Sequence, residues 1–359
     1  MQRDRIPELD LLRGVAIICV LLAHTPDYIG DHPWFEYGKH GFILIGLGAF
    51  AFLTGYGLEN TRLRKGGLQI KSYIQRRFWR MYVPYLVTLV IFLGVFGALK
   101  INRSLPFSIL SVTTVVHALG LQVLLYPKFR SIFTLWYVGL LLPMYAIYPL
   151  IVRKETTAYL VRCLVLILLV TLAIRYGFNT IDIRFFGYFP AFIGGIIIRR
   201  TRTLPFLLKG RWGLLALVSF VGLYMLHMQL WGGAVIYDRW QGENTAENTG
   251  YFVLPILKTY LLMALSLIAI LCFLRFVVQT KQLHWVAKVL GYIASGAYFT
   301  YLIHRPVLAF FAWVTVDKLS LPSSLITLLF LPVVAGIIAV CHITEKAYAK
   351  RLIAQPKSG

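Results

Sequence analysis

Long apolar stretches separated by short polar segments recur along the whole chain. Because a helix needs about 20 apolar residues to cross the hydrocarbon core of a bilayer, these stretches predict membrane-spanning helices. The apolar residues do not alternate with polar ones, which argues against the strands of a membrane barrel. The predicted spans are 9–28, 40–58, 82–99, 132–151, 158–176, 184–198, 212–231, 251–276, 288–314 and 322–341. We therefore predict an all-α polytopic membrane protein with about ten transmembrane helices.

The basic residues predict which ends of these spans face the cytoplasm. Lys and Arg gather in short loops at alternate span ends, which is the positive-inside pattern. The loop after the second span has seven of them with no acid among them: Arg62, Arg64, Lys65, Lys71, Arg76, Arg77 and Arg80. The terminal segments are basic too, with Arg3, Arg5, Lys346, Lys350, Arg351 and Lys357. We therefore predict that both termini are cytoplasmic.

The segment 104–125 is also apolar enough to cross the membrane. A crossing there would move Arg153 and Lys154 to the outside and break the charge pattern. We therefore expect a re-entrant or surface-lying helix at 104–125. No external loop is long enough for a separate folded domain, so residues 1–359 are expected to form a single transmembrane domain.

Composition narrows the class of protein further. The chain is 58% hydrophobic and 14% charged, which excludes disorder and argues against a soluble domain. A net charge of +22 could suit nucleic acid, but the basic residues lie at span ends, so the partner they indicate is the lipid bilayer. The four cysteines have no paired spacing, and His117 and His227 have no companions at ligand spacing. We expect neither a nucleic-acid partner nor a metal.

Ionisable side chains within the first span are candidates for chemistry. Asp10, Arg13, His24 and Asp27 share one helical face, and Arg13 and His24 lie about 16 Å apart along the axis. Asp10 can neutralise Arg13, three residues later. Since charges at membrane depth are costly, they indicate a functional site, with His24 as a base and Arg13 as a positioning residue. The alternative is a packing pair, in which Arg13 snorkels and His24 hydrogen-bonds a neighbouring helix.

Arg76, Arg77 and Arg80 end the basic loop. Arg77 and Arg80 lie one turn apart and can present two guanidinium groups to a polyphosphate. From charge alone, anchoring at the cytoplasmic surface explains these arginines as well.

Two aromatic-rich groups complete the candidates. Tyr301, His304 and Arg305 precede a proline in the ninth span, which predicts a bent helix lining a cavity, although a structural histidine at a kink is the alternative. Trp136 and Tyr137 begin the fourth span, where aromatic residues are typical of the membrane interface.

Together these pieces resemble the acyltransferase-3 family of integral membrane O-acyltransferases. Five segments carry the resemblance in order along the chain, and each alone is a weak signal. They are Leu9-Asp10-Leu11-Leu12-Arg13-Gly14 with His24, Arg77-Phe78-Trp79-Arg80, Leu135-Trp136-Tyr137 with Tyr148-Pro149, Ser295-Gly296-Ala297-Tyr298 with Tyr301-Leu302-Ile303-His304-Arg305-Pro306, and Glu345.

The resemblance implies transfer of an acyl group, usually acetyl, from a cytoplasmic acyl-CoA such as acetyl-CoA to a hydroxyl of an extracytoplasmic glycan. The implied catalytic group is His24 with Arg13 and Asp10. The implied CoA-binding group is Arg77 and Arg80 with Arg76 beside them. The implied substrate-binding residues are Trp136, Tyr137, Tyr301, His304 and Arg305.

Several alternatives stay open at this point. His24 acts either as a general base on the acceptor hydroxyl or as a nucleophile that carries the acyl group. Arg305 departs from the family, where this position is often aromatic or apolar, so it either contacts an acidic sugar or pairs with a neighbour. The alternative function is a non-enzymatic carrier or flippase for a lipid-linked sugar or acyl group. Because the family is mainly bacterial, the expected location is a bacterial plasma membrane.

Overall fold

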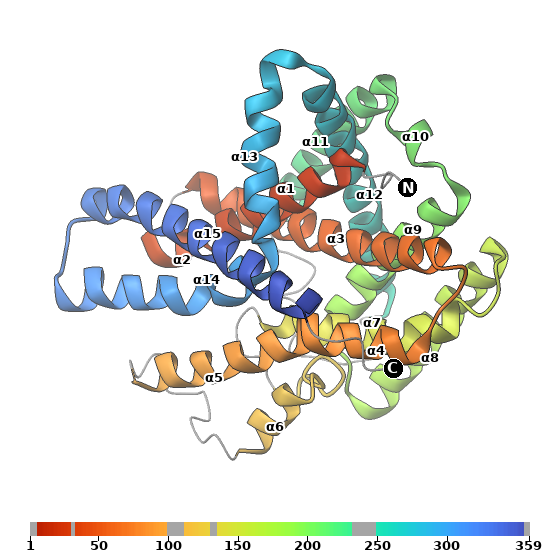
Figure 1. Ribbon diagram of the computed structural model, residues 1–359, viewed down its shortest axis with the longest axis horizontal. Coiled ribbons are helices and arrows are strands. Elements are labelled where there is room, and N and C mark those ends of the chain that lie inside the picture. Colours follow the sequence, from red (N-terminus) through yellow and green to blue (C-terminus); the bar gives the residue numbers. More distant parts are fainter. Residues whose placement is uncertain (1–5, 30–32, 99–110, 130–134, 232–248, 355–359) are drawn as a thin grey trace.

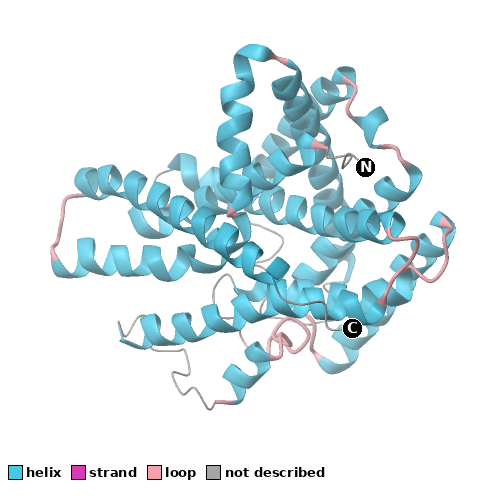
Figure 2. Ribbon diagram, viewed as in Figure 1, coloured by secondary structure: helices cyan, strands magenta, loops and turns pink. Residues whose placement is uncertain are grey.

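Helices make up the regular structure of this chain (Figures 1 and 2). The computed structural model describes residues 6–29, 33–98, 111–129, 135–231 and 249–354. The α-helices there are α1 (Pro7–His24), α2 (Pro26–Ile29), α3 (Pro33–Arg64), α4 (Ile70–Arg77), α5 (Val83–Ala98), α6 (Val112–Ala118), α7 (Trp136–Ile151), α8 (Thr157–Phe178), α9 (Ile183–Thr201), α10 (Leu204–Leu207), α11 (Gly210–Trp231), α12 (Thr249–Gln279), α13 (His284–Ser295), α14 (Ala297–Ala312) and α15 (Ser323–Ala354). Two π-helical segments, η1 (Phe78–Tyr82) and η5 (Trp313–Lys318), and a short 3-10 helix, η4 (Lys281–Leu283), join them.

Seven helical stretches in the described part are long and apolar enough to cross a membrane. They are Pro7–Ile29, Gly38–Arg64, Ile70–Ala98, Thr157–Phe178, Ile256–Gln279, Ala297–Lys318 and Ser323–Arg351. The predicted all-α, multi-pass architecture is thus confirmed. The other predicted spans, 132–151, 184–198 and 212–231, coincide with helices α7, α9 and α11. The count of ten spans and the cytoplasmic termini stay predictions.

The prediction of one continuous span over 288–314 is wrong. Helix α13 ends at Ser295, and α14 begins at Ala297 in a different direction (Figure 1). The reason is a close approach at Gly296, where a Cβ atom would lie 2.7 Å from the backbone nitrogen of His342 in α15. The apolar pattern runs on through Gly296 and therefore does not reveal this break.

In the described part of the segment predicted to be re-entrant or surface-lying, 104–125, there is one short helix, α6. Helix α6 has seven residues, and at 1.5 Å per residue it is too short to cross a bilayer. Hydroxyls of Tyr82 and Tyr85 donate to the carbonyls of Ala118 and His117 and attach α6 to η1 and α5. Residues 104–110 lie outside the described part of the chain.

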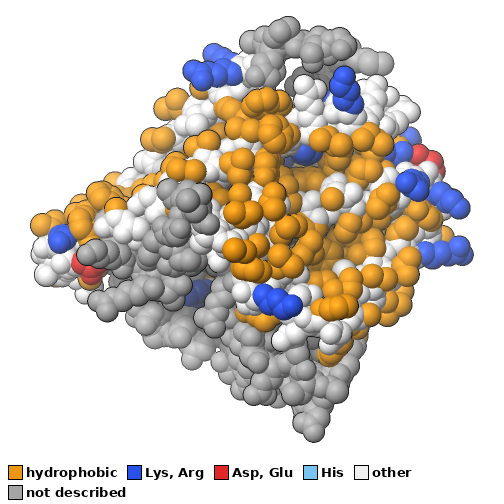
Figure 3. All heavy atoms as spheres, turned by 90° about the horizontal axis from the view of Figure 1, so that it is seen from below, with side chains coloured by type: hydrophobic (Ala, Val, Ile, Leu, Met, Phe, Trp, Pro, Cys, Tyr) orange, Lys and Arg blue, Asp and Glu red, His pale blue; other side chains and the backbone are white. Residues whose placement is uncertain are grey.

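Much of the apolar surface is turned outward, as expected for a protein surrounded by lipid. In helix α8 only Leu160 and Arg175 are buried. Its outward side chains include Val161, Val165, Leu166 and Leu169. Figure 3 shows hydrophobic side chains across much of the described part of one face, with Lys and Arg side chains mostly towards its edges. In water such a surface would be strongly unfavourable, so the fold requires a bilayer.

Helices α3 and α9 pack closely because glycines lie where their backbones meet. A Cβ at Gly55 would lie 1.9 Å from the carbonyl oxygen of Phe192, and one at Gly195 would lie 2.1 Å from that of Phe52. Small residues at such contacts let membrane helices gain van der Waals packing, which replaces the hydrophobic driving force that lipid does not supply. This contact positions α3, which runs through the middle of the helices in Figure 1.

The α3–α9 contact generates the first prediction. Gly195→Ala should lower the melting temperature of the purified protein by several degrees, because the added methyl would clash with the α3 backbone. Gly194→Ala is the matched control, since a Cβ at Gly194 meets nothing within 4 Å and the gain in helix propensity is the same. Equal melting temperatures for the two variants would contradict the packing argument.

Candidate active site

A cavity of about 600 Å³ opens between helices α1, α3, α7, α13, α14, α15 and the α4–η1 junction. We call it the Arg77 cavity. Along α3 its lining runs from Phe50 to Thr61, which is about 16 Å of helix. The arginines Arg13, Arg77 and Arg80 contribute to its wall. The cavity therefore brings together an arginine of the first helix and two arginines of the basic loop.

The arginines of the Arg77 cavity outnumber the acids around them. Arg13 pairs with Asp10 at 3.5 Å, and Arg80 lies 3.8 Å from Glu345, which also lines the cavity. The Arg77 guanidinium lies over the Tyr145 ring, 5.1 Å from its centroid. The Nε of Arg77 is buried and has no hydrogen-bond partner among the described residues. The arrangement suits a polyanionic ligand.

The chain places Arg77 and Arg80 on the cavity by means of a local helix irregularity. Pro84 has no N–H to give to the carbonyl of Arg80, so a regular α-helix cannot continue through this point. The backbone instead forms the π-helical segment η1, in which the N–H of Val83 donates to the carbonyl of Phe78. Arg76 lies one residue before Arg77, is exposed and donates to Ser72, and it does not line the cavity.

His24 is held by an acid at the end of the first helix. It is the last residue of α1, and its Nδ1 lies 3.3 Å from Oδ2 of Asp27. Because a carboxylate can only accept, Nδ1 carries the hydrogen and Nε2 keeps a lone pair. Asp27 also accepts from Lys39 at 2.9 Å and from Arg305 at 2.7 Å. His24 is thus arranged as a base or nucleophile.

A second histidine stacks on His24. The rings of His24 and His304 lie 5.5 Å apart with an interplanar angle of 29°. His304 is fully buried, and its Nδ1 contacts the carbonyls of Thr300 and Tyr301 at 3.0 and 2.8 Å. Since carbonyls only accept, Nδ1 is protonated, and the buried Nε2 has no partner in the described part of the chain. Each of the two stacked rings therefore keeps a lone pair on its Nε2.

Aromatic rings connect the Arg77 cavity to the histidine pair. His24 does not line that cavity, whereas Phe50, Tyr137 and Tyr301 do. Their three rings contact one another with centroids 5.7 to 6.5 Å apart. The Tyr301 ring also lies 6.0 Å from the ring of His304. Tyr301 therefore touches both the cavity and the histidine pair.

The residues predicted from sequence to bind substrate lie at three places. Tyr137 and Tyr301 line the Arg77 cavity, and the Tyr137 hydroxyl donates to the carbonyl of Leu47. His304 and Arg305 lie beside His24 and Asp27. Trp136 does not line the cavity, and its ring lies 3.9 Å from the guanidinium of Arg184. Arg305 pairs with a neighbour, which was one of the two interpretations of its charge.

Sequence patterns assign no role to two acids that the structure shows to be central, Asp27 and Glu59. Asp27 shares the face of His24 in the sequence, and that spacing was the signal for its role. Glu59 is fully buried and accepts from Arg62, from Arg200 and from the hydroxyl of Tyr148. The hydrogen bond to Glu59 gives a role to Tyr148, which the sequence motif alone did not explain.

The Arg62 guanidinium extends this network to the loop after α7. It donates to the carboxylate of Glu155, at 2.6 and 2.9 Å. These hydrogen bonds hold the pKa of Glu155 below its ordinary value. Glu155 is largely exposed, so the network joins the buried Glu59 to the surface.

Comparisons with known proteins agree with the resemblance. A family model described as an acyltransferase domain, Acyl_transf_3, matches residues 6–344. No curated protein matches the chain, and no solved structure matches it either. Among the residues that the structure describes, no group of three His, Cys, Asp or Glu side chains could hold a metal ion.

The arrangement around Asp27 generates the second prediction. Arg305→Gln and Asp27→Asn should each lower the melting temperature, because each removes one ion-pair partner of a partly buried charge. The double variant should lose less than the sum of the two, with a coupling of about 1 kcal/mol or more. Thermal unfolding in nanodiscs measures this, and strictly additive shifts would show that the pair contributes nothing.

Proposed function

Because the chain belongs to the acyltransferase-3 family, we propose that this membrane acyltransferase is an O-acyltransferase, most simply an O-acetyltransferase. The donor is acetyl-CoA or another acyl-CoA from the cytoplasm. The acceptor is a hydroxyl of an extracytoplasmic or cell-surface glycan. The location we propose is the cell membrane of a bacterium. The observation that carries the proposal is the Arg77 cavity, with three arginines in its wall.

The Arg77 cavity supports a donor that bears several phosphates. Arg77 and Arg80 come from one end of the basic loop, and Arg13 faces the same cavity from α1. Guanidinium groups bind phosphate oxygens in pairs, which gives both strength and orientation. A CoA nucleotide bound there would direct its pantetheine arm past Leu53 and Leu141 towards Tyr137 and Tyr301. The thioester would then approach the histidine pair.

The pair formed by His24 and Asp27 supports acyl transfer at the inner end of this path. With Nδ1 donating to Asp27, the Nε2 lone pair of His24 takes the proton from the acceptor hydroxyl. The hydroxyl oxygen attacks the thioester carbon, the carbon–sulfur bond breaks, and the CoA thiolate leaves and takes up a proton. Asp27 keeps the ring in the productive tautomer and stabilises the imidazolium that forms.

The same lone pair allows a second route in which His24 itself accepts the acyl group and then passes it to the hydroxyl. The two routes differ when acceptor is absent. Incubation with acetyl-CoA alone, followed by mass spectrometry of peptides that contain His24, separates them. An acetyl adduct on His24 indicates the second route, and an unmodified His24 with intact acetyl-CoA indicates the first.

The third prediction concerns His24. His24→Ala should reduce acetyl-CoA-dependent transfer by at least about a thousand-fold, because the proton acceptor is removed. Its acetyl-CoA affinity should stay within a factor of two, since His24 does not line the Arg77 cavity. His284→Ala, at an exposed histidine in α13, is the matched control and should keep full activity. Transfer by His24→Ala at the wild-type rate would refute the assignment.

The fourth prediction concerns the donor. Arg77→Gln with Arg80→Gln should weaken acetyl-CoA binding by about tenfold or more, because two charge-assisted contacts to phosphate are lost. The binding of desphospho donor analogues should be less affected. Arg76→Gln is the matched comparison in the same helix, because Arg76 is outside the cavity lining. Equal weakening by the substitutions at Arg76, Arg77 and Arg80 would indicate a general attraction between the anionic donor and the basic residues. No weakening would indicate that Arg77 and Arg80 only anchor the chain at the membrane surface.

A further inference from the structure

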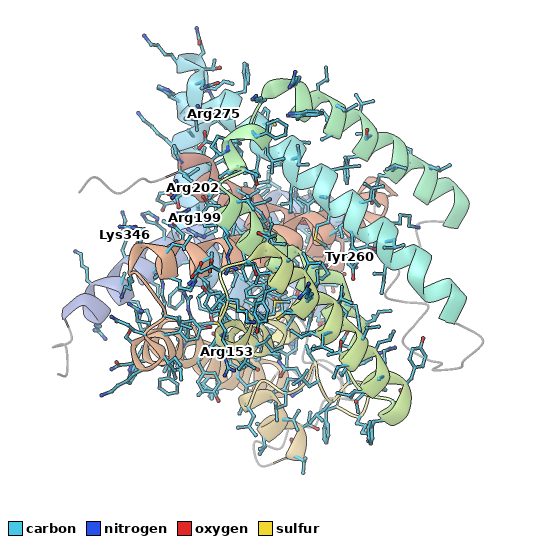
Figure 4. The ribbon with its side chains drawn as sticks, turned by 90° about the vertical axis from the view of Figure 1, so that its right-hand side faces the viewer. Arg153, Arg199, Arg202, Tyr260, Arg275 and Lys346 are labelled. Carbon is cyan, nitrogen blue, oxygen red and sulfur yellow. The ribbon has the colours of Figure 1, made fainter. Side chains whose placement is uncertain are left out.

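A second cavity, of about 870 Å³, lies where several helices end on one side of the molecule. We call it the Arg199 cavity. It is bounded by the start of α1, the last turn of α9, helix α10 and the end of α12. Four basic residues line it: Arg199, Arg202, Lys209 and Arg275. Figure 4 shows Arg199, Arg202 and Arg275 close together on this side of the molecule.

The positive charge of the Arg199 cavity is poorly balanced. Glu8 is the only acid among its lining residues, and this buried carboxylate accepts from Arg275 at 2.7 Å. Arg199, Arg202 and Lys209 form no ion pair within the described ranges. Arg199 donates its Nε to Asn60 at 2.8 Å, which fixes the guanidinium and leaves both terminal nitrogens without a described partner. Four cations that face one hollow repel one another unless an anion joins them.

Helix ends explain only part of this charge. Helices α9 and α12 end beside the cavity, and basic residues near a helix C-terminus are favourable because of its partial negative charge. Ordinary surface anchoring directs such side chains outward into water or headgroups. Here they line a concave space whose volume falls in the range of small-molecule sites.

The rest of the lining indicates an amphipathic environment. Pro7, Leu204 and Leu208 supply apolar wall next to the cations, and the buried Tyr56 also lines the cavity. The candidate spans that border the cavity begin at Pro7 or end at Arg64 and Gln279, so the cavity lies near span ends. Basic pockets between transmembrane helices at this level suit phosphate headgroups.

We propose that the Arg199 cavity is a second binding site, which holds a phosphate-bearing anion through Arg199, Arg202, Lys209 and Arg275. The phosphate belongs either to the headgroup of an anionic phospholipid or to a soluble phosphate compound. This site shares none of its lining with the donor site except Asn60, so it does not rest on the proposed acyl transfer. Its occupancy would tie α9, α10 and α12 to the start of α1.

Two arms of one binding experiment test this proposal with the full-length protein. In the first arm, native mass spectrometry of the protein in detergent compares dioleoylphosphatidylglycerol with dioleoylphosphatidylcholine. In the second, thermal-shift titration with sodium pyrophosphate is done in delipidated detergent. Preferential binding of phosphatidylglycerol identifies a headgroup site, and saturable stabilisation by pyrophosphate identifies a soluble ligand.

Arg202→Gln with Lys209→Gln should weaken whichever binding is found by at least tenfold. Both side chains are exposed and make no ion pair with described residues, so the variant should fold, and Arg202→Gln alone serves as a milder second variant. Lys288→Gln with Lys350→Gln removes the same charge from exposed sites outside both cavities and should change binding less than twofold. The variant with Arg77→Gln and Arg80→Gln should also retain binding at the Arg199 cavity.

Three outcomes would overturn the proposal. The first is the absence of binding in both arms. The second is equal binding by wild type and by the variant at Arg202 and Lys209. The third is loss of pyrophosphate binding only in the variant at Arg77 and Arg80, which would place the phosphate in the donor cavity. None of these outcomes depends on whether the protein transfers acyl groups.

Discussion

The cost of a charge inside an apolar protein body governs how these helices are held together. Glu59, Asp182 and Glu8 are buried carboxylates, and each accepts from at least one arginine. An unpaired carboxylate in such surroundings would be strongly destabilising. Because some of the partners come from distant helices, satisfying these charges also fixes which helices lie together. Glu59 joins α3 to α9 through Arg200, and Glu8 joins α1 to α12 through Arg275.

The same rule shapes the candidate active site. Asp27, in α2, balances Lys39 and Arg305 and orients His24, so one carboxylate supports groups from α1, α3 and α14. Arg305 and Asp27 are 278 positions apart in the sequence, so the charge on α14 is explained only by the folded chain. A residue that looked like a departure from its family is therefore part of the support for the histidine.

Sequence patterns predicted most of the helices, since lipid exposure imposes long apolar stretches that are easy to recognise. They did not reveal the break at Gly296, because the break depends on the approach of α15 and not on hydropathy. Arg77 and Arg80 could be selected from their spacing. The spacing did not show that Arg76 lies outside the cavity, because that depends on how α4 passes into η1. Lys39 and Glu59 gave no signal, since their roles rest on contacts between helices.

The three rings of Phe50, Tyr137 and Tyr301 have a consequence for the integrity of the membrane. An enzyme that takes its donor from one side of the membrane and its acceptor from the other contains two water-filled entrances. A continuous passage between them would let ions leak through and dissipate the ion gradients of the cell. Tyr301 lines the Arg77 cavity and its ring lies 6.0 Å from that of His304, so in the function proposed above the three rings would separate the two entrances. In the proposed reaction, only the small, uncharged acyl group has to cross these rings. The nucleotide can remain on its own side throughout, and the insulating property of the bilayer is preserved during turnover.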